Sequence, residues 1–220
     1  NLPTKYQQRR LLVWEALQGK VSLEDVSLAY DAVDAAFNKV WREHHITWPI
    51  EERLDVIITG LKQKRPEKWG ALVKATSRME VDIPPNLIDG CAETLAALSQ
   101  TYQLAIVSDA IVTPGTWLRE LLVNHGIREY FSAFAFSDEV GHSKPHPDMF
   151  TTVLDSMRLA PEEVVHIGDR DHNDIKGAQS MGMKAILFTA TRDVDKDHTT
   201  ADAICDAYAS LTQTIEDLSS

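Results

Sequence analysis

The chain has 220 residues and a mass of 24.6 kDa, which is enough for one domain with a substantial insert or for two small domains. Its hydrophobic fraction of 44% and charged fraction of 25% are ordinary for a globular protein and exclude the disordered and fibrous classes. The formal net charge of −11 argues against nucleic-acid binding, because phosphate backbones are bound through clustered lysine and arginine side chains.

No apolar run approaches the roughly 20 residues that a membrane-spanning helix needs, and the first residues lack a signal-peptide pattern. We therefore expect a cytoplasmic protein that binds neither membrane nor nucleic acid. Cys91 and Cys205 lie far apart and form no CxxC pair, so they predict two buried free thiols rather than a disulfide or a zinc site.

The first part of the chain, residues 1–83, is predicted to form a helical module. Apolar side chains recur there at intervals of three and four residues, which is typical of amphipathic helices. The last two of four expected helices cover 49–61 and 66–79, and each has a proline near its first turn. The stretch Asp82-Ile-Pro-Pro-Asn86 then ends the periodicity, because proline removes a backbone donor and restricts φ.

From residue 84 to residue 220, short apolar runs alternate with helical stretches. This alternation predicts an α/β fold, a Rossmann-like parallel sheet with helices on both faces. Strands are expected over 104–107, 133–136, 164–168, 185–188 and 203–205, and helices over 87–99, 114–125, 147–157 and 174–181 and after the last strand.

Polar residues follow two of these strands. Ligands of open parallel sheets bind beyond the carboxyl ends of the strands, where Ser108 and Asp169 fall. Asp169 and Asp174 are five positions apart, and two carboxylates suit a hard cation such as Mg²⁺. A serine hydroxyl can hydrogen-bond phosphoryl oxygens, and Lys144, in a loop before a helix, can neutralise their charge. The combination indicates phosphoryl transfer.

Three segments resemble motifs II, III and IV of the haloacid dehalogenase superfamily, in that family's order. They are Val107-Ser-Asp109, Ser143-Lys-Pro-His-Pro-Asp-Met-Phe150 and Ile167-Gly-Asp-Arg-Asp-His-Asn-Asp174. Phe136-Ser-Asp-Glu-Val-Gly141 and Gly126-Ile-Arg-Glu-Tyr-Phe131 also resemble members that carry a helical cap after the first motif.

The resemblance implies a Rossmann-like core with a C1-type helical cap, and Mg²⁺-dependent hydrolysis of a small phosphorylated metabolite through an aspartyl-phosphate. Ser108 and the backbone N–H of Asp109 would bind phosphate, and Lys144 would steady the nucleophile and the phosphoryl group. Asp169 and Asp174 would hold the metal. The form Gly-Asp-x-x-x-x-Asp favours a phosphatase over a 2-haloacid dehalogenase.

The family's first motif, an apolar strand that runs into Asp-x-Asp, does not stand before the helical module. Asp193-Val-Asp195 is interpreted as a solvated loop, and Asp55-Val-Ile-Ile-Thr59 lies in a helical pattern and lacks the second aspartate. In the family that strand is central, and each orphaned backbone group costs about 1–3 kcal/mol against a total stability of about 5–15 kcal/mol. We therefore expect an N-terminally truncated chain, inactive and unstable alone, whose first motif lies upstream.

Other interpretations stay open at this point. The chain could be a pseudoenzyme or interaction module that binds phosphate and metal without catalysis. Asp174 could simply cap a helix, and His166, Asp171 and His172 could bind zinc. His142 and His146 could contact substrate or tune Lys144, or lie free on a surface loop. The cap tryptophans, of which one could line a substrate pocket, otherwise predict core packing; they are Trp14, Trp41, Trp48 and Trp69.

Overall fold

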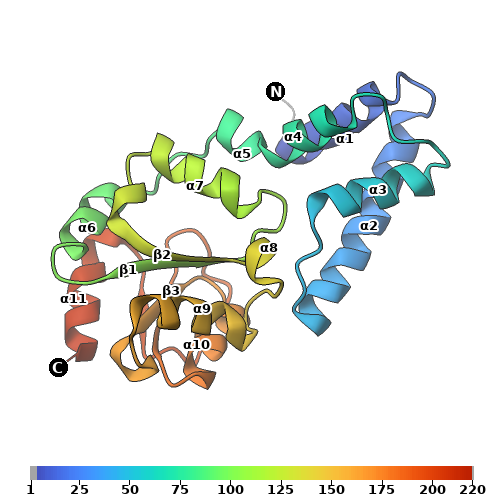
Figure 1. Cartoon of the computed structure of the whole chain (residues 1–220). Helices are drawn as coiled ribbons and strands as arrows, with labels where there is room; N and C mark the ends of the chain where they lie inside the picture. Colours follow the sequence, from blue (N-terminus) through green and yellow to red (C-terminus); the bar gives the residue numbers. More distant parts are fainter. Residues whose placement is uncertain (1–3, 220) are drawn as a thin grey trace. The chain divides into compact units, whose positions relative to one another are not determined.

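A computed structural model describes residues 4–219 of the chain (Figure 1). The described residues divide into two compact units. The first contains the residues up to Pro84 together with Ala110–Leu121, and the second contains Pro85–Asp109 and the residues from Leu122 onward.

The first unit is helical. It contains α1 (Lys5–Ala16), α2 (Leu23–His44), α3 (Ile50–Gly60), α4 (Trp69–Ser77) and the short α5 (Met79–Asp82). One apolar core joins the first four of these helices, because their apolar faces follow the helical repeat. The side chains buried in it are Val13, Leu17, Val26, Tyr30, Val33, Ile50, Leu54, Ile57, Ile58 and Leu72. Trp14, Trp48 and Trp69 pack against this core, as the spacing predicted.

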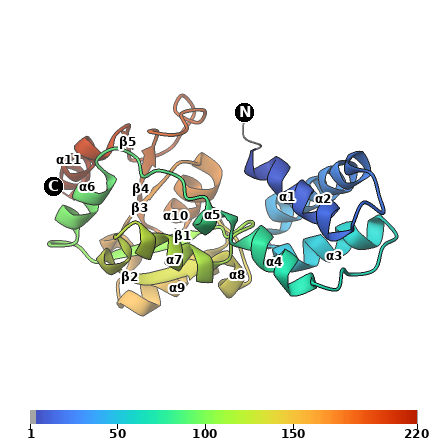
Figure 2. The same ribbon diagram turned by 90° about the horizontal axis from the view of Figure 1, so that it is seen from above.

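The rest of the chain alternates helices and strands. In chain order these are α6 (Cys91–Leu98), β1 (Leu104–Ser108), α7 (Gly115–Asn124), β2 (Phe131–Phe136), α8 (Ser137–Val140), α9 (Pro147–Met157), β3 (Val165–Gly168), a π-helical turn (Asp171–Lys176), α10 (Gly177–Ser180), β4 (Lys184–Phe188), β5 (Ala203–Cys205) and α11 (Tyr208–Ser219). Figure 2 shows the same elements from above.

All the strand pairs of the second unit are parallel, as predicted, but they form two sheets. One sheet has the order β1-β2 and the other has the order β3-β4-β5. Within residues 4–219, β1 and β3 each therefore have one edge without a strand partner. Their residues are all half-buried, whereas Ala185, Ile186 and Leu187 in the middle of β4 are fully buried.

Helices cover both faces of the β3-β4-β5 sheet, which confirms the predicted α/β architecture. Successive side chains of β4 point to opposite faces, because the side-chain repeat of a strand is two. Ala185 and Leu187 pack with Phe150 of α9 in one apolar cluster. Ile186 and Phe188 pack in another, which α6 and α11 complete.

Two further expectations concern the cysteines and the membrane. Cys91 and Cys205 are both buried and free, as predicted. Within the described part of the chain, no helix combines the length and the apolar character that crossing a bilayer requires.

Candidate active site

The carboxyl ends of β1 and β3 are joined by the side chain of Lys144. Its Nζ donates one hydrogen bond to the backbone carbonyl of Val107, at 2.9 Å, and another to Asp174 Oδ1, at 2.7 Å. Val107 is the penultimate residue of β1, and Asp174 belongs to the loop that follows β3. The structure therefore brings together the loops that carry the three predicted motifs, although they lie far apart in the sequence.

Asp174 is almost completely buried, with a side chain that is 3% exposed. Its Oδ1 accepts from Lys144 and lies 3.3 Å from His166 Nε2, and its Oδ2 accepts from the backbone N–H of Arg170 at 3.0 Å. Burial alone would raise the pKa of this carboxyl, but Lys144 and His166 outweigh it and hold the pKa well below its usual range. Asp174 is therefore a permanent anion at neutral pH.

Gly168, the last residue of β3, makes room for this carboxylate. A Cβ atom placed on Gly168 would lie 2.3 Å from Asp174 Cγ, far inside van der Waals contact. The glycine before Asp169 is thus required by the close approach of Asp174 to the end of the strand.

Asp109 holds the backbone of the lysine loop. Its Oδ1 accepts the N–H of Lys144 at 2.8 Å, and its Oδ2 accepts from Asn173 Nδ2 at 3.3 Å. The same Asn173 amide donates to the backbone carbonyl of Lys144 at 3.1 Å. Burial raises the pKa of Asp109 although Lys144 opposes it. The sequence predicted phosphate contact for Asp109 and did not single out Asn173, for which the only signal was its position beside Asp174.

Ser108 and Asp169 are the two predicted residues whose side chains are uncommitted. Both are half-buried, and neither side chain makes a hydrogen bond to another of residues 4–219. Ser108 is the last residue of β1 and Asp169 directly follows β3, at the strand ends where Lys144 lies. Their oxygen atoms are consequently available to a ligand.

A second group of contacts holds the loop of Asp169. Arg192 Nη1 donates to the backbone carbonyl of Asp169 at 2.7 Å and to Asp195 Oδ2 at 2.5 Å. Asp195 Oδ2 also accepts the N–H of Asp171 at 3.0 Å. The hydrogen bond from Arg192 and that from the Asp171 amide lower the pKa of Asp195. Asp195 lies in a loop whose preceding residues, Asp193 and Val194, are exposed, as predicted, and its own half-buried carboxylate has these partners.

The zinc interpretation of this loop finds no geometric support. His166 turns its Nε2 toward Asp174, and Asp171 pairs with Lys176 at 2.7 Å and accepts the N–H of Thr200. His172 is exposed. His166 and Asp171 are thus engaged with other residues, and His172 lies at the surface.

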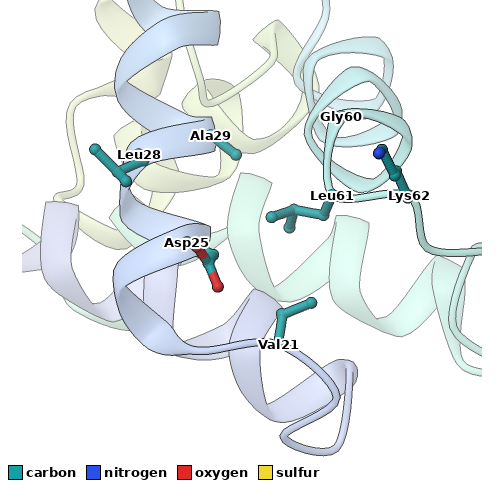
Figure 3. Close-up of a pocket in the computed structure, with 7 residues that line it drawn as sticks. All are labelled: Val21, Asp25, Leu28, Ala29, Gly60, Leu61 and Lys62. Atoms are coloured by element: carbon teal, nitrogen blue, oxygen red, sulfur yellow. The ribbon is translucent and has the colours of Figure 1, made fainter.

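The first unit also contains a surface pocket of about 430 Å³ (Figure 3). It contains none of the predicted site residues, nor any of the four tryptophans considered for a substrate pocket. Its lining comes from the turn before α2, the first part of α2 and the end of α3 with the two residues after it, and consists of Val21, Asp25, Leu28, Ala29, Gly60, Leu61 and Lys62.

The chain is similar to known proteins over most of its length. The family model described as "Haloacid dehalogenase-like hydrolase" matches residues 27–188. A glyceraldehyde 3-phosphate phosphatase of Methanothermobacter thermautotrophicus is 37% identical over 101 residues, which are 46% of this chain and 43% of that protein. A phosphoserine phosphatase of Thermus thermophilus is 36% identical over 97 residues, 43% of this chain and 38% of that protein. The chain thus matches less than half the length of these curated relatives.

Solved structures agree with the fold. A HAD phosphatase from Thermococcus onnurineus superposes with a TM-score of 0.68 at 20% identity, covering 96% of this chain and 87% of that one. YfnB from Bacillus subtilis, described as a HAD hydrolase and solved with bound magnesium, gives a TM-score of 0.65 at 18% identity, covering 96% and 91%. At these identities the likeness shows the fold alone.

Proposed function

Because the chain belongs to the haloacid dehalogenase-like hydrolase family, we propose that it forms the cap and core of a Mg²⁺-dependent phosphatase that acts on a small phosphorylated metabolite. In this proposal the residues up to 83 form the cap and those from 84 onward form the core. The curated relatives named above are phosphatases of glyceraldehyde 3-phosphate and phosphoserine, which are small phosphomonoesters.

One observation carries the proposal: the uncommitted carboxylate of Asp169 beside the buried Lys144–Asp174 pair. The carboxylate of Asp169 makes no side-chain hydrogen bond to another of residues 4–219, so both its oxygens are open to a cation. Arg192, whose guanidinium lies close enough to interact electrostatically, is already paired with Asp195. Asp169 therefore suits a metal ligand.

The donor set fits Mg²⁺. This ion prefers oxygen ligands and is usually held by one or two carboxylates, with water and substrate phosphate completing the shell. Asp169 offers both oxygens. Asp174 Oδ2 accepts a hydrogen bond from the backbone N–H of Arg170 and keeps a lone pair for the ion or for a water bound to it. When bound, the metal would supply positive charge beside the transferring phosphoryl group.

The protein's own groups have separate parts in this proposal. Lys144, positioned by Asp174 and by the Val107 carbonyl, presents an ammonium group that neutralises phosphoryl oxygens. The hydroxyl of Ser108 and the N–H of Asp109 bind the same oxygens. Because the Asp109 carboxylate is occupied by Lys144 and Asn173, we assign its side chain to positioning the lysine loop.

The nucleophile and the general acid–base, two aspartates in the family's reaction, would come from a strand that pairs with the open edges of β1 and β3. The half-burial of both strands supports this, since the central strands of a covered parallel sheet are normally fully buried. The Asp-x-Asp that directly follows β3, Asp169-Arg170-Asp171, does not supply this pair, because Asp169 is assigned to the metal and Asp171 pairs with Lys176.

The test is Mg²⁺-dependent release of inorganic phosphate from a generic aryl phosphate by the full-length product of the gene that encodes this chain. Asp169→Asn should lower turnover at least about 100-fold, because it removes charge stabilisation that preorganised groups provide. Asp193→Asn, which neutralises an exposed carboxylate in the loop after β4, is the matched control and should leave turnover unchanged.

Two results would count against the proposal in different ways. Equal turnover in wild type and Asp169→Asn would show that the acidic loop is misassigned. A folded protein that binds Mg²⁺ and releases no phosphate from any phosphomonoester would favour the binding module instead.

A further inference from the structure

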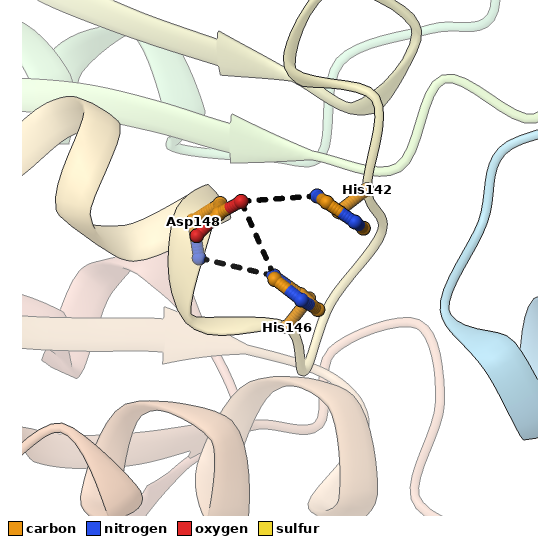
Figure 4. Close-up of side chains that lie close together, drawn as sticks. All are labelled: His142, His146 and Asp148. Carbon is orange, nitrogen blue, oxygen red and sulfur yellow. Dashed lines mark hydrogen bonds and ion pairs between the residues drawn. The ribbon is translucent and has the colours of Figure 1, made fainter.

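We propose that His142, His146 and Asp148 form a second metal site, selective for a transition-metal ion of the Zn²⁺ type, on the loop that carries Lys144 (Figure 4). His142 and His146 lie in the loop between α8 and α9, and Asp148 lies in the first turn of α9. The site shares no residue with the proposed Mg²⁺ site.

The distances between the donor atoms suit a shared ion. His142 Nδ1 lies 3.0 Å from Asp148 Oδ2, and His146 Nδ1 lies 3.6 Å from the same oxygen. Ligands about 2.0–2.2 Å from a tetrahedral zinc ion are separated by roughly 3.3 Å from one another, which falls between these two values. Small rotations of these three partly exposed side chains would therefore complete the coordination.

The two imidazole rings are already arranged side by side. They stack in parallel, with centroids 3.7 Å apart and an interplanar angle of 5°. Figure 4 shows that both rings present a nitrogen to the Asp148 carboxylate. Three donors from two loop residues and one helical residue thus converge without any change of backbone.

The two Nδ1 atoms differ in the hydrogen bonds that they make. His142 Nδ1 is shielded from solvent and has no hydrogen-bond partner among the described residues, although Asp148 Oδ2 is close. The N–H of Asp148 approaches His146 Nδ1 at 3.3 Å, which makes that nitrogen an acceptor. An acceptor nitrogen is deprotonated, as a metal ligand must be, and the ion would take the place of this long hydrogen bond.

The donor types set the class of ion. Two imidazoles and one carboxylate suit Zn²⁺ and its first-row neighbours, whereas Mg²⁺ prefers oxygen donors. All three side chains are partly exposed, so a small rotation of the His142 ring would open its shielded Nδ1 to an ion, and water can fill the remaining position.

A bound ion would restrain the lysine loop. His142 and His146 lie two residues before and two residues after Lys144, so one ion would tie both sides of that residue to the start of α9. This restraint on the neighbours of Lys144 would add to the hydrogen bonds that Lys144 makes with Asp109, Asp174 and Val107.

The experiment is a Zn²⁺ titration of the intact protein against a chromogenic chelator, in excess Mg²⁺ to occupy the oxygen site. We expect one Zn²⁺ per chain. Loss of even an outer-shell partner weakens metal binding by about 10–100-fold, so His142→Ala and His146→Ala should each weaken it at least about tenfold. His198→Ala, which removes an exposed loop histidine, is the matched control and should bind like wild type.

A measurement without substitutions guards against misfolded variants. In wild-type protein, Zn²⁺ should shift the imidazole resonances of His142 and His146 and leave those of His198 in place. The proposal is overturned if folded wild type binds no Zn²⁺ stoichiometrically, or if both histidine variants bind it as tightly as wild type. Asp169→Asn should retain the zinc site, so loss of zinc in that variant would also overturn the proposal, whatever the outcome of the phosphatase assay.

Discussion

Replacing Asp174 with asparagine tests whether the buried ion pair with Lys144 organises the candidate site. The two side chains are 3% and 12% exposed, so the variant leaves a lysine charge buried without its counter-ion. Removal of one partner from a buried pair typically costs about 3–5 kcal/mol. Because the amide can still accept from the Arg170 N–H, we expect a loss at the lower end, about 3 kcal/mol.

The assay is urea unfolding followed by far-ultraviolet circular dichroism. All five tryptophans, at positions 14, 41, 48, 69 and 117, belong to the first unit, so their fluorescence follows that unit and serves as an internal reference. Asp174→Asn should shift the transition of the second unit. Adding Lys144→Met should recover part of the loss, since it removes the unpaired charge. Asp55→Asn, which breaks an exposed pair with Arg65, should leave both transitions unchanged.

The stability of wild type and of Asp174→Asn at acid pH tests the same ion pair independently. A carboxyl whose pKa is lowered by folding contributes stability that is complete above its unfolded pKa of about 3.9 and is lost as the pH falls toward its folded pKa. Wild type should therefore lose more stability than Asp174→Asn below about pH 5. If the variant is within about 0.5 kcal/mol of wild type at pH 7 and has the same acid slope, the ion pair does not have the role assigned here.

Two further predictions concern the residues around this pair. Gly168→Ala should destabilise the second unit by about 1–3 kcal/mol, because the new Cβ would displace the Asp174 carboxylate. Urea unfolding measures this loss, and an unchanged midpoint would show that the end of β3 can shift to accommodate the Cβ. Arg192→Ala should raise the Mg²⁺ concentration needed for half-maximal phosphatase activity severalfold, because the backbone of Asp169 loses its anchor, and an unchanged Mg²⁺ dependence would contradict this.

The sequence predicted the bounds of those helices and strands whose ends are set by neighbouring residues. The helix Pro147–Met157 and the strand Ala203–Cys205 have the predicted bounds, the first because proline opens it and Arg158 ends it in a left-handed conformation. The helix expected at 174 instead follows a π-helical turn that begins at Asp171. Asp171 contacts Asp195 and Thr200, far along the chain, and no local pattern could show that.

The sequence predicted residues of the candidate site but not the contacts between them. Ser108 and Asp169 lie at strand ends, where parallel-sheet topology places ligand-binding loops. The direct bond between Lys144 and Asp174 joins residues 30 positions apart, and spacing alone does not reveal it. The positioning of the Lys144 backbone by Asp109 and Asn173 likewise depends on how three loops meet.

The open edges of β1 and β3 have a consequence for how the polypeptide behaves in solution. A strand edge without a partner is a template for another chain, and proteins usually protect such edges with charge, proline or a bulge. The segments Leu104–Ser108 and Val165–Gly168 contain no lysine, arginine, aspartate, glutamate or proline. We therefore expect residues 4–219 alone to self-associate with rising concentration, as light scattering would show, and a peptide strand that fits between these edges to keep them monomeric.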